Sequence, residues 1–256
     1  LNGDTIHLTP ELSAEIQQAI GSDIAMLFDE CVALPATQKA LETAVDRSLL
    51  WGKRFFDVPR LPNQKVFGIV QGGTSGDLRQ KSLEGTLLLP IDGIAIGGLS
   101  VGEPHSEMVR VLEGVGPKLP STLPHYLMGV GTPRDLLEGV RCGIDMFDCV
   151  APTRRARNGS LYISPKSGGN PGNKYTLSIR NSEFTLDSQP IDSQCTCYTC
   201  QTFSRAYLRH LFMASEILYH RLATIHNVHF MLNLVNQIRE SIINQQFQSF
   251  KKLWLG

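Results

Sequence analysis

Five short apolar runs in the first 150 residues constrain the fold of this chain more than any other feature. They span residues 24–28, 66–70, 94–99, 126–130 and 144–150, and each is continuous rather than alternating with polar residues. Continuous apolar strands are typical of parallel sheets covered on both faces. Segments with helical periodicity lie between the runs, at 37–55 and 104–114, and from a Thr132-Pro133 helix start through Val140. This alternation predicts right-handed βα units and a parallel sheet or barrel.

Polar or backbone-exposing residues gather where these predicted strands end. In chain order, the ends carry Asp29, Gln71, Gly98 with Leu99, Met128, and Asp148. An α/β barrel places its active site at this edge. A single carboxylate at a strand end is more often a helix cap or loop anchor than a nucleophile, but several convergent polar groups favour a binding site. Asp145 should face away from Asp148 by strand alternation, which indicates a structural role.

Three arginines follow Asp148 in the stretch GIDMFDCVAPTRRARNG, residues 143–159. The apolar run is expected to break at Pro152 into a loop that carries Arg154, Arg155 and Arg157. A solvated surface and a phosphate-binding role are both compatible with this pattern. The glycine-rich stretches VQGG and IGGLSVGE lack the lysine and the spacing of phosphate loops. Their glycines are better suited to letting a flat ligand approach the backbone.

The cluster CTCYTC is the sharpest local signal in the chain. Cys195, Cys197 and Cys200 can converge on one ion, and in a chain of this size they do not indicate a disulfide scaffold. A later histidine would close the site: His226 is preferred, and the rivals are His210, His220 and His229. Zinc held by four protein ligands is structural, because no coordination position stays open for substrate. The alternative is three buried thiols without metal.

The pattern changes after residue 160. A Gly/Pro/Ser/Asn-rich loop at 164–173 is followed by strand-like pieces, the cysteines and a helical segment at 227–245. We therefore expect the barrel in residues 1–160 and a smaller unit in 161–256. Phe203, Tyr207 and His210 share one helical face, which is either core or a subunit contact.

Bulk properties exclude few functions. The 24 basic and 24 acidic residues give zero net charge, which argues against nucleic-acid binding by bulk charge but not against a local basic patch. The sequence has no apolar run of membrane-spanning length and no secretory leader. It starts on Leu1, so we expect that the natural N-terminus lies further upstream.

Several motifs occur together in an order that resembles the bacterial tRNA-guanine transglycosylases. The motifs follow one another over essentially the whole chain. In order they are FDEC, VQGG, AIGGLSVGE, YLMGVGTP, GIDMFDCV followed by PTR and ARNG, and the cysteine cluster with its later histidine. The resemblance implies a (β/α)8 barrel with a zinc-binding subdomain, incomplete here because the first strands and a DSGG-type motif with the general base have no match. It also implies a cytoplasmic homodimer that contacts its partner through the Phe203, Tyr207 and His210 region.

The resemblance also implies an activity and roles for single residues. Members exchange guanine at the wobble position 34 of GUN-anticodon tRNAs for preQ1, 7-aminomethyl-7-deazaguanine, in queuosine biosynthesis. Asp148 matches the nucleophile that attacks ribose C1′. The positions matching base contacts are Asp29 and Gln71 at the edge, the Gly98 backbone, the Leu99 carbonyl, and Met128 over one face. Arg154 and Arg157 match contacts to the anticodon loop, while Cys195, Cys197, Cys200 and His226 match the ligands of one structural zinc ion.

Two further positions and three rival functions complete the expectations. Cys31 and Val101 resemble the preQ1-using bacterial branch more than the queuine-using eukaryotic enzymes. The rivals are a non-catalytic partner subunit, an RNA-binding module that relies on zinc and arginines alone, and an unrelated barrel enzyme with a metal-stabilised subdomain. An intact DMFDCV argues against the first, the polar strand ends argue against the second, and the ordered motifs argue against the third.

Overall fold

The computed structural model describes residues 3 and 5–256 and forms two compact units. The first unit runs to Val130 and resumes over Glu138–Asp148, while the second unit comprises Gly131–Leu137 and Cys149–Gly256. The units divide after Asp148, and the expected division into 1–160 and 161–256 stays a prediction of domain organisation.

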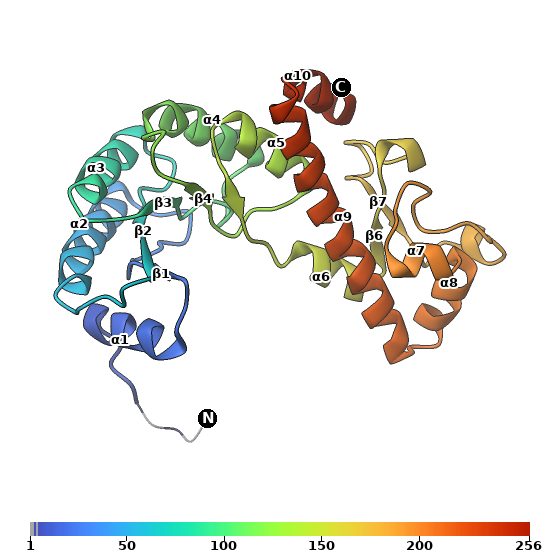
Figure 1. Ribbon diagram of the computed structural model, residues 1–256, viewed down its shortest axis with the longest axis horizontal. Helices are drawn as coiled ribbons and strands as arrows, with labels where there is room; N and C mark the ends of the chain where they lie inside the picture. Colours follow the sequence, from blue (N-terminus) through green and yellow to red (C-terminus); the bar gives the residue numbers. More distant parts are fainter. Residues whose placement is uncertain (1–2, 4) are drawn as a thin grey trace. The chain divides into compact units, whose positions relative to one another are not determined.

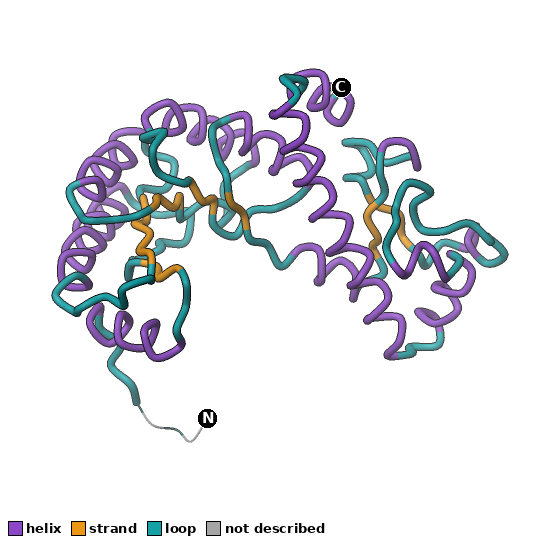
Figure 2. The backbone as a smooth tube through the Cα atoms, viewed as in Figure 1, coloured by secondary structure: helices purple, strands orange, loops and turns teal. Residues whose placement is uncertain are grey.

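A parallel sheet forms the centre of the first unit. Its order is β1 (Ile24–Met26), β2 (Lys65–Val70), β3 (Gly93–Ile96), β4 (His125–Leu127) and β5 (Met146–Phe147), with every neighbouring pair parallel. The sheet curls, and helices follow its outer side (Figures 1 and 2). These helices are α1 (Pro10–Ile20), α2 (Gln38–Phe55), α3 (Gly76–Leu87) and α4 (His105–Val115), with the 3-10 turn η1 (Gly116–Lys118) after α4; α5 (Pro133–Arg141) precedes β5. The sequential strand order and the curl confirm the predicted βα units of an incomplete barrel.

Local signals in the sequence explain where the helices of this unit begin. The Thr37 hydroxyl accepts a hydrogen bond from the Ala40 N–H at the start of α2, and Ser75 does the same for Leu78 in α3. All four residues of β3 are buried, as continuous apolar strands require. Helix α4 buries Met108, Val111, Leu112 and Val115 against this strand's core cluster. Each such side chain contributes roughly 1.5–3 kcal/mol on burial.

The structure differs from expectation after β5. The predicted apolar run 144–150 forms only the short strand β5, and the predicted arginine loop is helix α6 (Ala151–Arg157). Pro152 was read as a break, but proline is tolerated in the first turn of a helix, where its missing N–H has no intrahelical partner to lose.

The second unit combines a small hairpin with helices. Strands β6 (Ser160–Tyr162) and β7 (Thr176–Ser178) pair antiparallel, and the short turns are η2 (Pro165–Ser167) and η3 (Ser182–Phe184). The helices are α7 (Tyr198–Thr202), α8 (Arg205–Met213), α9 (Ile217–Ile243) and α10 (Phe247–Leu255). Helix α9 begins well before the predicted 227–245 segment, because no glycine or proline interrupts the chain from Ile217 onward. In residues 3 and 5–256, no helix is long and apolar enough to cross a membrane.

Candidate functional site

Asp29 and Gln71 come together at the carboxyl edge of the sheet. Asp29 follows β1 and Gln71 follows β2, and the Gln71 Nε2 donates to Asp29 Oδ2 at 2.6 Å. Gln71 is buried, and its own N–H donates to Ser82 Oγ at 2.9 Å. Burial raises the pKa of Asp29 above its ordinary value, although the Gln71 amide opposes this rise. The pair therefore presents an acceptor and an amide in fixed relative positions.

Two glycines after β3 make room for Gln71. A Cβ at Gly98 would lie 2.3 Å from Gln71 Oε1, and one at Gly97 would lie 2.6 Å from Gln71 Nε2. Gly98 also has a φ of +61°, a left-handed conformation that favours glycine. Leu99, the next residue, is buried in the core cluster of the first unit. The predicted close approach of this backbone is thus made to a protein side chain, Gln71.

The turn that follows is held by a glutamate that the sequence interpretation overlooked. The Glu103 carboxylate accepts hydrogen bonds from the Ser100 N–H and, at 3.0 Å, from the Val101 N–H. Ser100 has a φ of +58°, which is unusual for a residue with a side chain. Glu103 is the last residue of the glycine-rich stretch IGGLSVGE, and this position was the sequence feature that could have indicated its role in the turn.

Asp148 is held through a single carboxylate oxygen. Its Oδ1 accepts the Tyr126 hydroxyl at 2.7 Å and the Gly129 N–H at 2.6 Å. Among the described residues both hydrogen bonds go to Oδ1, so Oδ2 is free to meet a substrate. Burial and the adjacent Asp148 carboxylate raise the pKa of Tyr126, which keeps its hydroxyl a donor.

Asp145 lies at the other end of the same short strand. Its Oδ2 accepts the His125 N–H at 2.8 Å, at the start of β4. Asp148, in contrast, contacts Tyr126 within β4 and Gly129 beyond its end. Asp145 therefore anchors the amino-terminal end of β4, as the strand alternation suggested.

The strand ends form two local groups on one edge of the sheet. One group contains Asp29, Gln71 and Gly98, and the other contains Asp148 with the segment around Met128. Met128 is half-buried, and its N–H continues the ladder to Ile96 O at 3.2 Å. Because all five strands are parallel and adjacent, their carboxyl ends face the same side.

Helix α6 gives its three arginines different exposures. Arg155 is half-buried, and its guanidinium carbon lies 5.9 Å from the centroid of the Tyr162 ring. Arg154 and Arg157 are exposed, and their i,i+3 spacing places them on the same side of the helix. Residues at this spacing can contact one polyanionic ligand together.

Four side chains in the second unit could hold a metal ion. The ligand atoms of Cys195, Cys197, Cys200 and His226 all lie within 4.8 Å of one another. His226 Nδ1 is 3.6 Å from the sulfurs of Cys195 and Cys197 and 3.3 Å from that of Cys200. Tetrahedral zinc, with Zn–S of about 2.3 Å and Zn–N of about 2.0–2.1 Å, requires S···N separations of about 3.6 Å. The donor set and its dimensions thus fit zinc.

Contacts around His226 and Cys197 are compatible with metal binding by both side chains. The His226 ring is fully buried in the middle of α9, and Nε2 lies 2.8 Å from the Tyr162 carbonyl oxygen. A proton on Nε2 leaves Nδ1 unprotonated toward the sulfurs, the usual arrangement of a metal-binding histidine. The neighbouring Cys195 and Cys200 thiols hold the pKa of Cys197 below its ordinary value. Of the rival histidines, His229 instead lies 3.5 Å from Thr196 Oγ1.

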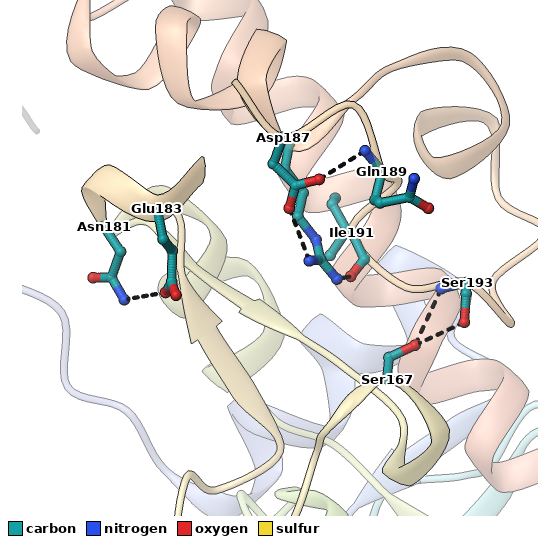
Figure 3. A network of polar contacts seen from close by, with 8 residues as sticks. Ser167, Asn181, Glu183, Asp187, Gln189, Ile191 and Ser193 are labelled. Carbon is teal, nitrogen blue, oxygen red and sulfur yellow. Dashed lines mark hydrogen bonds and ion pairs between the residues drawn. The ribbon is translucent and has the colours of Figure 1, made fainter. Parts of the chain in front are cut away.

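The segment before the cysteines is fixed by a polar network (Figure 3). Asp187 accepts from the Gln189 N–H at 2.8 Å and pairs with Arg205 at 3.0 Å, and Arg205 also donates to the Ile191 carbonyl at 2.9 Å. Ser167, on the glycine-rich loop, accepts from the Ser193 N–H at 3.1 Å.

The loop at 164–173, which had no expected role, contributes a second anchor. Buried Asp192 accepts hydrogen bonds from the hydroxyls of Ser164, at 3.1 Å, and Ser167, at 2.7 Å. It also accepts the Gln194 N–H at 2.8 Å. The loop thereby holds Asp192 and Ser193, three and two residues before Cys195.

The aromatic side chains expected on one helical face do not form the core of α8. Leu208 and Leu211 are the buried residues of this helix, whereas Tyr207 is 39% exposed. The Phe203 and Tyr207 rings stack with centroids 5.2 Å apart, and His210 is exposed. Phe203 precedes α8 and packs, partly buried, against the core cluster of this unit, so the three side chains do not share one helical face, and the subunit contact stays a prediction.

The zero net charge of the chain conceals opposite charges on the two units. The second unit carries thirteen Lys and Arg against six Asp and Glu, a net charge of +7. The first unit carries the remaining eleven basic and eighteen acidic residues, a net charge of −7. The zero net charge of the whole chain therefore coexists with a basic second unit, which the sequence interpretation left open as a local basic patch.

Fold and site together define an α/β barrel-type protein, as predicted, whose second unit carries a Cys3His cluster that could hold a metal ion. The family model for queuine tRNA-ribosyltransferase matches residues 1–256, and the chain belongs to this family. It is 49% identical over 252 residues to the queuine tRNA-ribosyltransferase of Syntrophobacter fumaroxidans, and 50% identical over 258 residues to that of a Janthinobacterium species. These matches cover 98% of this chain but 65% and 66% of the relatives, so the chain spans less than two thirds of their length.

Proposed function

We propose that this protein exchanges guanine at wobble position 34 of GUN-anticodon tRNAs for preQ1, through a covalent Asp148–ribose intermediate. Family membership supports the class of reaction, because the similar proteins are named queuine tRNA-ribosyltransferases. The observation that carries the proposal is the Asp148 carboxylate, held through Oδ1 by Tyr126 and Gly129 at the edge where Asp29 and Gln71 also end.

Asp148 would act as the nucleophile in two displacements. Its free Oδ2 forms a bond to ribose C1′ as the bond from C1′ to guanine N9 breaks, and guanine leaves with that electron pair and takes up a proton. The incoming base then loses its N9 proton, attacks C1′ and releases the carboxylate. Because positive charge develops at C1′, a fixed anion stabilises both transition states. Tyr126 and Gly129 keep the carboxylate oriented through each step.

The strand ends would bind the base during the exchange. Asp29 and Gln71 hydrogen-bond its polar edge, and the Gly98 N–H donates to it. The Leu99 carbonyl receives the aminomethyl group of preQ1, and Met128 covers one face of the ring.

The second unit would bind the RNA. A target base must leave its stack before it can enter a pocket, and cations hold the displaced backbone. Arg154 and Arg157 are exposed together on α6 within a unit of net charge +7. One structural zinc ion at Cys195, Cys197, Cys200 and His226 would stabilise this unit without taking part in the chemistry. A homodimer through Phe203, Tyr207 and His210, in the cytoplasm, completes the proposal.

The test is incorporation of radiolabelled guanine into tRNA by the protein and two matched variants. Asp148→Asn should abolish exchange yet retain tRNA binding, because a neutral amide cannot act as the anionic nucleophile. Asp145→Asn should stay active, since its amide oxygen can still accept the His125 N–H. Strong exchange by Asp148→Asn would remove the nucleophile from the proposal.

A further inference from the structure

Arg79, in helix α3, is a buried cation bound only to backbone carbonyls. It has no exposed surface, and its donors reach the oxygens of Val70 and Gly73 at 2.8 Å, Gly97 at 2.7 Å and Gly98 at 3.1 Å. Among the described residues it forms no ion pair. Burial lowers its pKa to about 10, so it remains charged at neutral pH. Burying a cation is costly, and the four carbonyl dipoles offset part of that cost, together with the negative charge of Glu103.

The contacted carbonyls determine how two peptide groups face the site. In a trans peptide the C=O and the following N–H point in opposite directions. The Gly97 carbonyl belongs to the same peptide group as the Gly98 N–H, so the hydrogen bond from Arg79 turns that N–H away from α3. The Gly98 carbonyl is likewise coupled to the Leu99 N–H.

Neither glycine has a side chain that could hold these peptide groups, and a Cβ at either would meet Gln71. The freedom that admits Gln71 would also let the peptide rotate, because glycine tolerates many backbone conformations. Arg79 restricts this freedom from behind the loop. A cation at the carbonyl also polarises the peptide, which strengthens the N–H as a donor.

We propose that Arg79 is a positioning residue that fixes and polarises the Gly98 N–H for a carbonyl acceptor on the incoming base. The inference rests on the proposed function, in which that N–H donates to the base. It makes Arg79 a determinant of selectivity for bases with a strong acceptor, such as the exocyclic carbonyl of guanine.

Arg79→Lys tests this role because it retains a cation but loses the guanidinium fork that reaches several carbonyls. The KM for guanine should rise by about tenfold, as expected for one lost hydrogen bond, while the KM for tRNA stays unchanged. Arg110→Lys is the matched control: Arg110 lies on the neighbouring helix and donates to the Thr74 carbonyl at 2.8 Å, away from Gly98.

A second probe separates positioning from general stability. 6-Thioguanine keeps the ring and amine of guanine but replaces the carbonyl oxygen with sulfur, a weaker acceptor. Wild-type protein should prefer guanine over 6-thioguanine in kcat/KM, and Arg79→Lys should lose most of this preference. A preference that is unchanged in folded Arg79→Lys overturns the inference, as does failure of both Arg79→Lys and Arg79→Gln to fold, which would assign Arg79 to stability alone. Full-length wild-type protein that exchanges no guanine would instead refute the proposed function.

Discussion

Removal of zinc should unfold the second unit and leave the first unit folded. Structural zinc contributes about 10–16 kcal/mol of apparent binding free energy in small zinc-binding peptides. The whole free energy of unfolding of a domain is about 5–15 kcal/mol. The loss is therefore as large as the stability of the second unit, whereas the cores of the first unit contain none of the four ligands.

The two tryptophans of the chain report on the units separately. Trp254, in the second unit, is 5% exposed and has its ring centroid 6.1 Å from that of Phe230, one turn after His226 on α9. Trp51 lies in the first unit, 4.9 Å from the Phe28 ring. The Trp51→Phe variant retains only Trp254, so its fluorescence emission reports on the second unit. The Trp254→Phe variant retains only Trp51 and reports on the first unit.

A chelator should shift Trp254 emission to the red and leave Trp51 emission unchanged. His226→Ala should reproduce the shift, whereas His229→Ala, outside the cluster, should not. Metal analysis of the same samples should show about one zinc ion per chain before chelation. Unchanged Trp254 emission in protein that has lost its zinc would refute the reasoning, as would equal shifts from both tryptophans.

Three further outcomes follow from the site. Arg154→Ala and Arg157→Ala should each weaken tRNA binding and lower by about one the slope of log binding constant against log salt concentration. Arg155→Ala should change this slope less, and equal slopes for the three variants in binding titrations would contradict the assignment. Burial raises the pKa of Asp29, so protonation of this carboxylate should weaken guanine binding at a higher pH than for an ordinary carboxyl group. The KM for guanine, measured against pH, should therefore rise on acidification in the wild type, and this acid-side rise should be absent in Asp29→Asn. The protein should form a dimer that Tyr207→Ala weakens, and a monomeric mass for wild type at micromolar concentration would count against the interface.

The spacing of apolar residues and the polar residues at the strand ends were sufficient to predict the parallel fold. The five apolar runs each contain a strand, and burial on both faces explains the continuous apolar pattern of β2 and β3. Pro152 misled the interpretation, because the same residue ends one helix and begins another depending on its position. The convergence of Cys195, Cys197 and Cys200 was predictable because three cysteines within six residues leave few other arrangements.

Residues that act through the backbone could not be predicted in the same way. Arg79 looks like any charged residue of an amphipathic helix, and only the packing of α3 shows that its guanidinium meets carbonyls. Tyr126 sits within an apolar strand, where its hydroxyl is invisible to periodicity. The different exposures of Arg154 and Arg155 also depend on the helical form of α6, because a helix turns adjacent side chains toward different sides.

The most direct test of the account is to identify the residue bonded to the ribose. The protein should be incubated with tRNA in the absence of free base, denatured, digested and mapped by mass spectrometry. We predict a nucleotide adduct on the peptide that contains Asp148, and its loss in Asp148→Asn but not in Asp145→Asn. A covalent complex that persists in Asp148→Asn, or an adduct that maps to another carboxylate, would contradict the central claim.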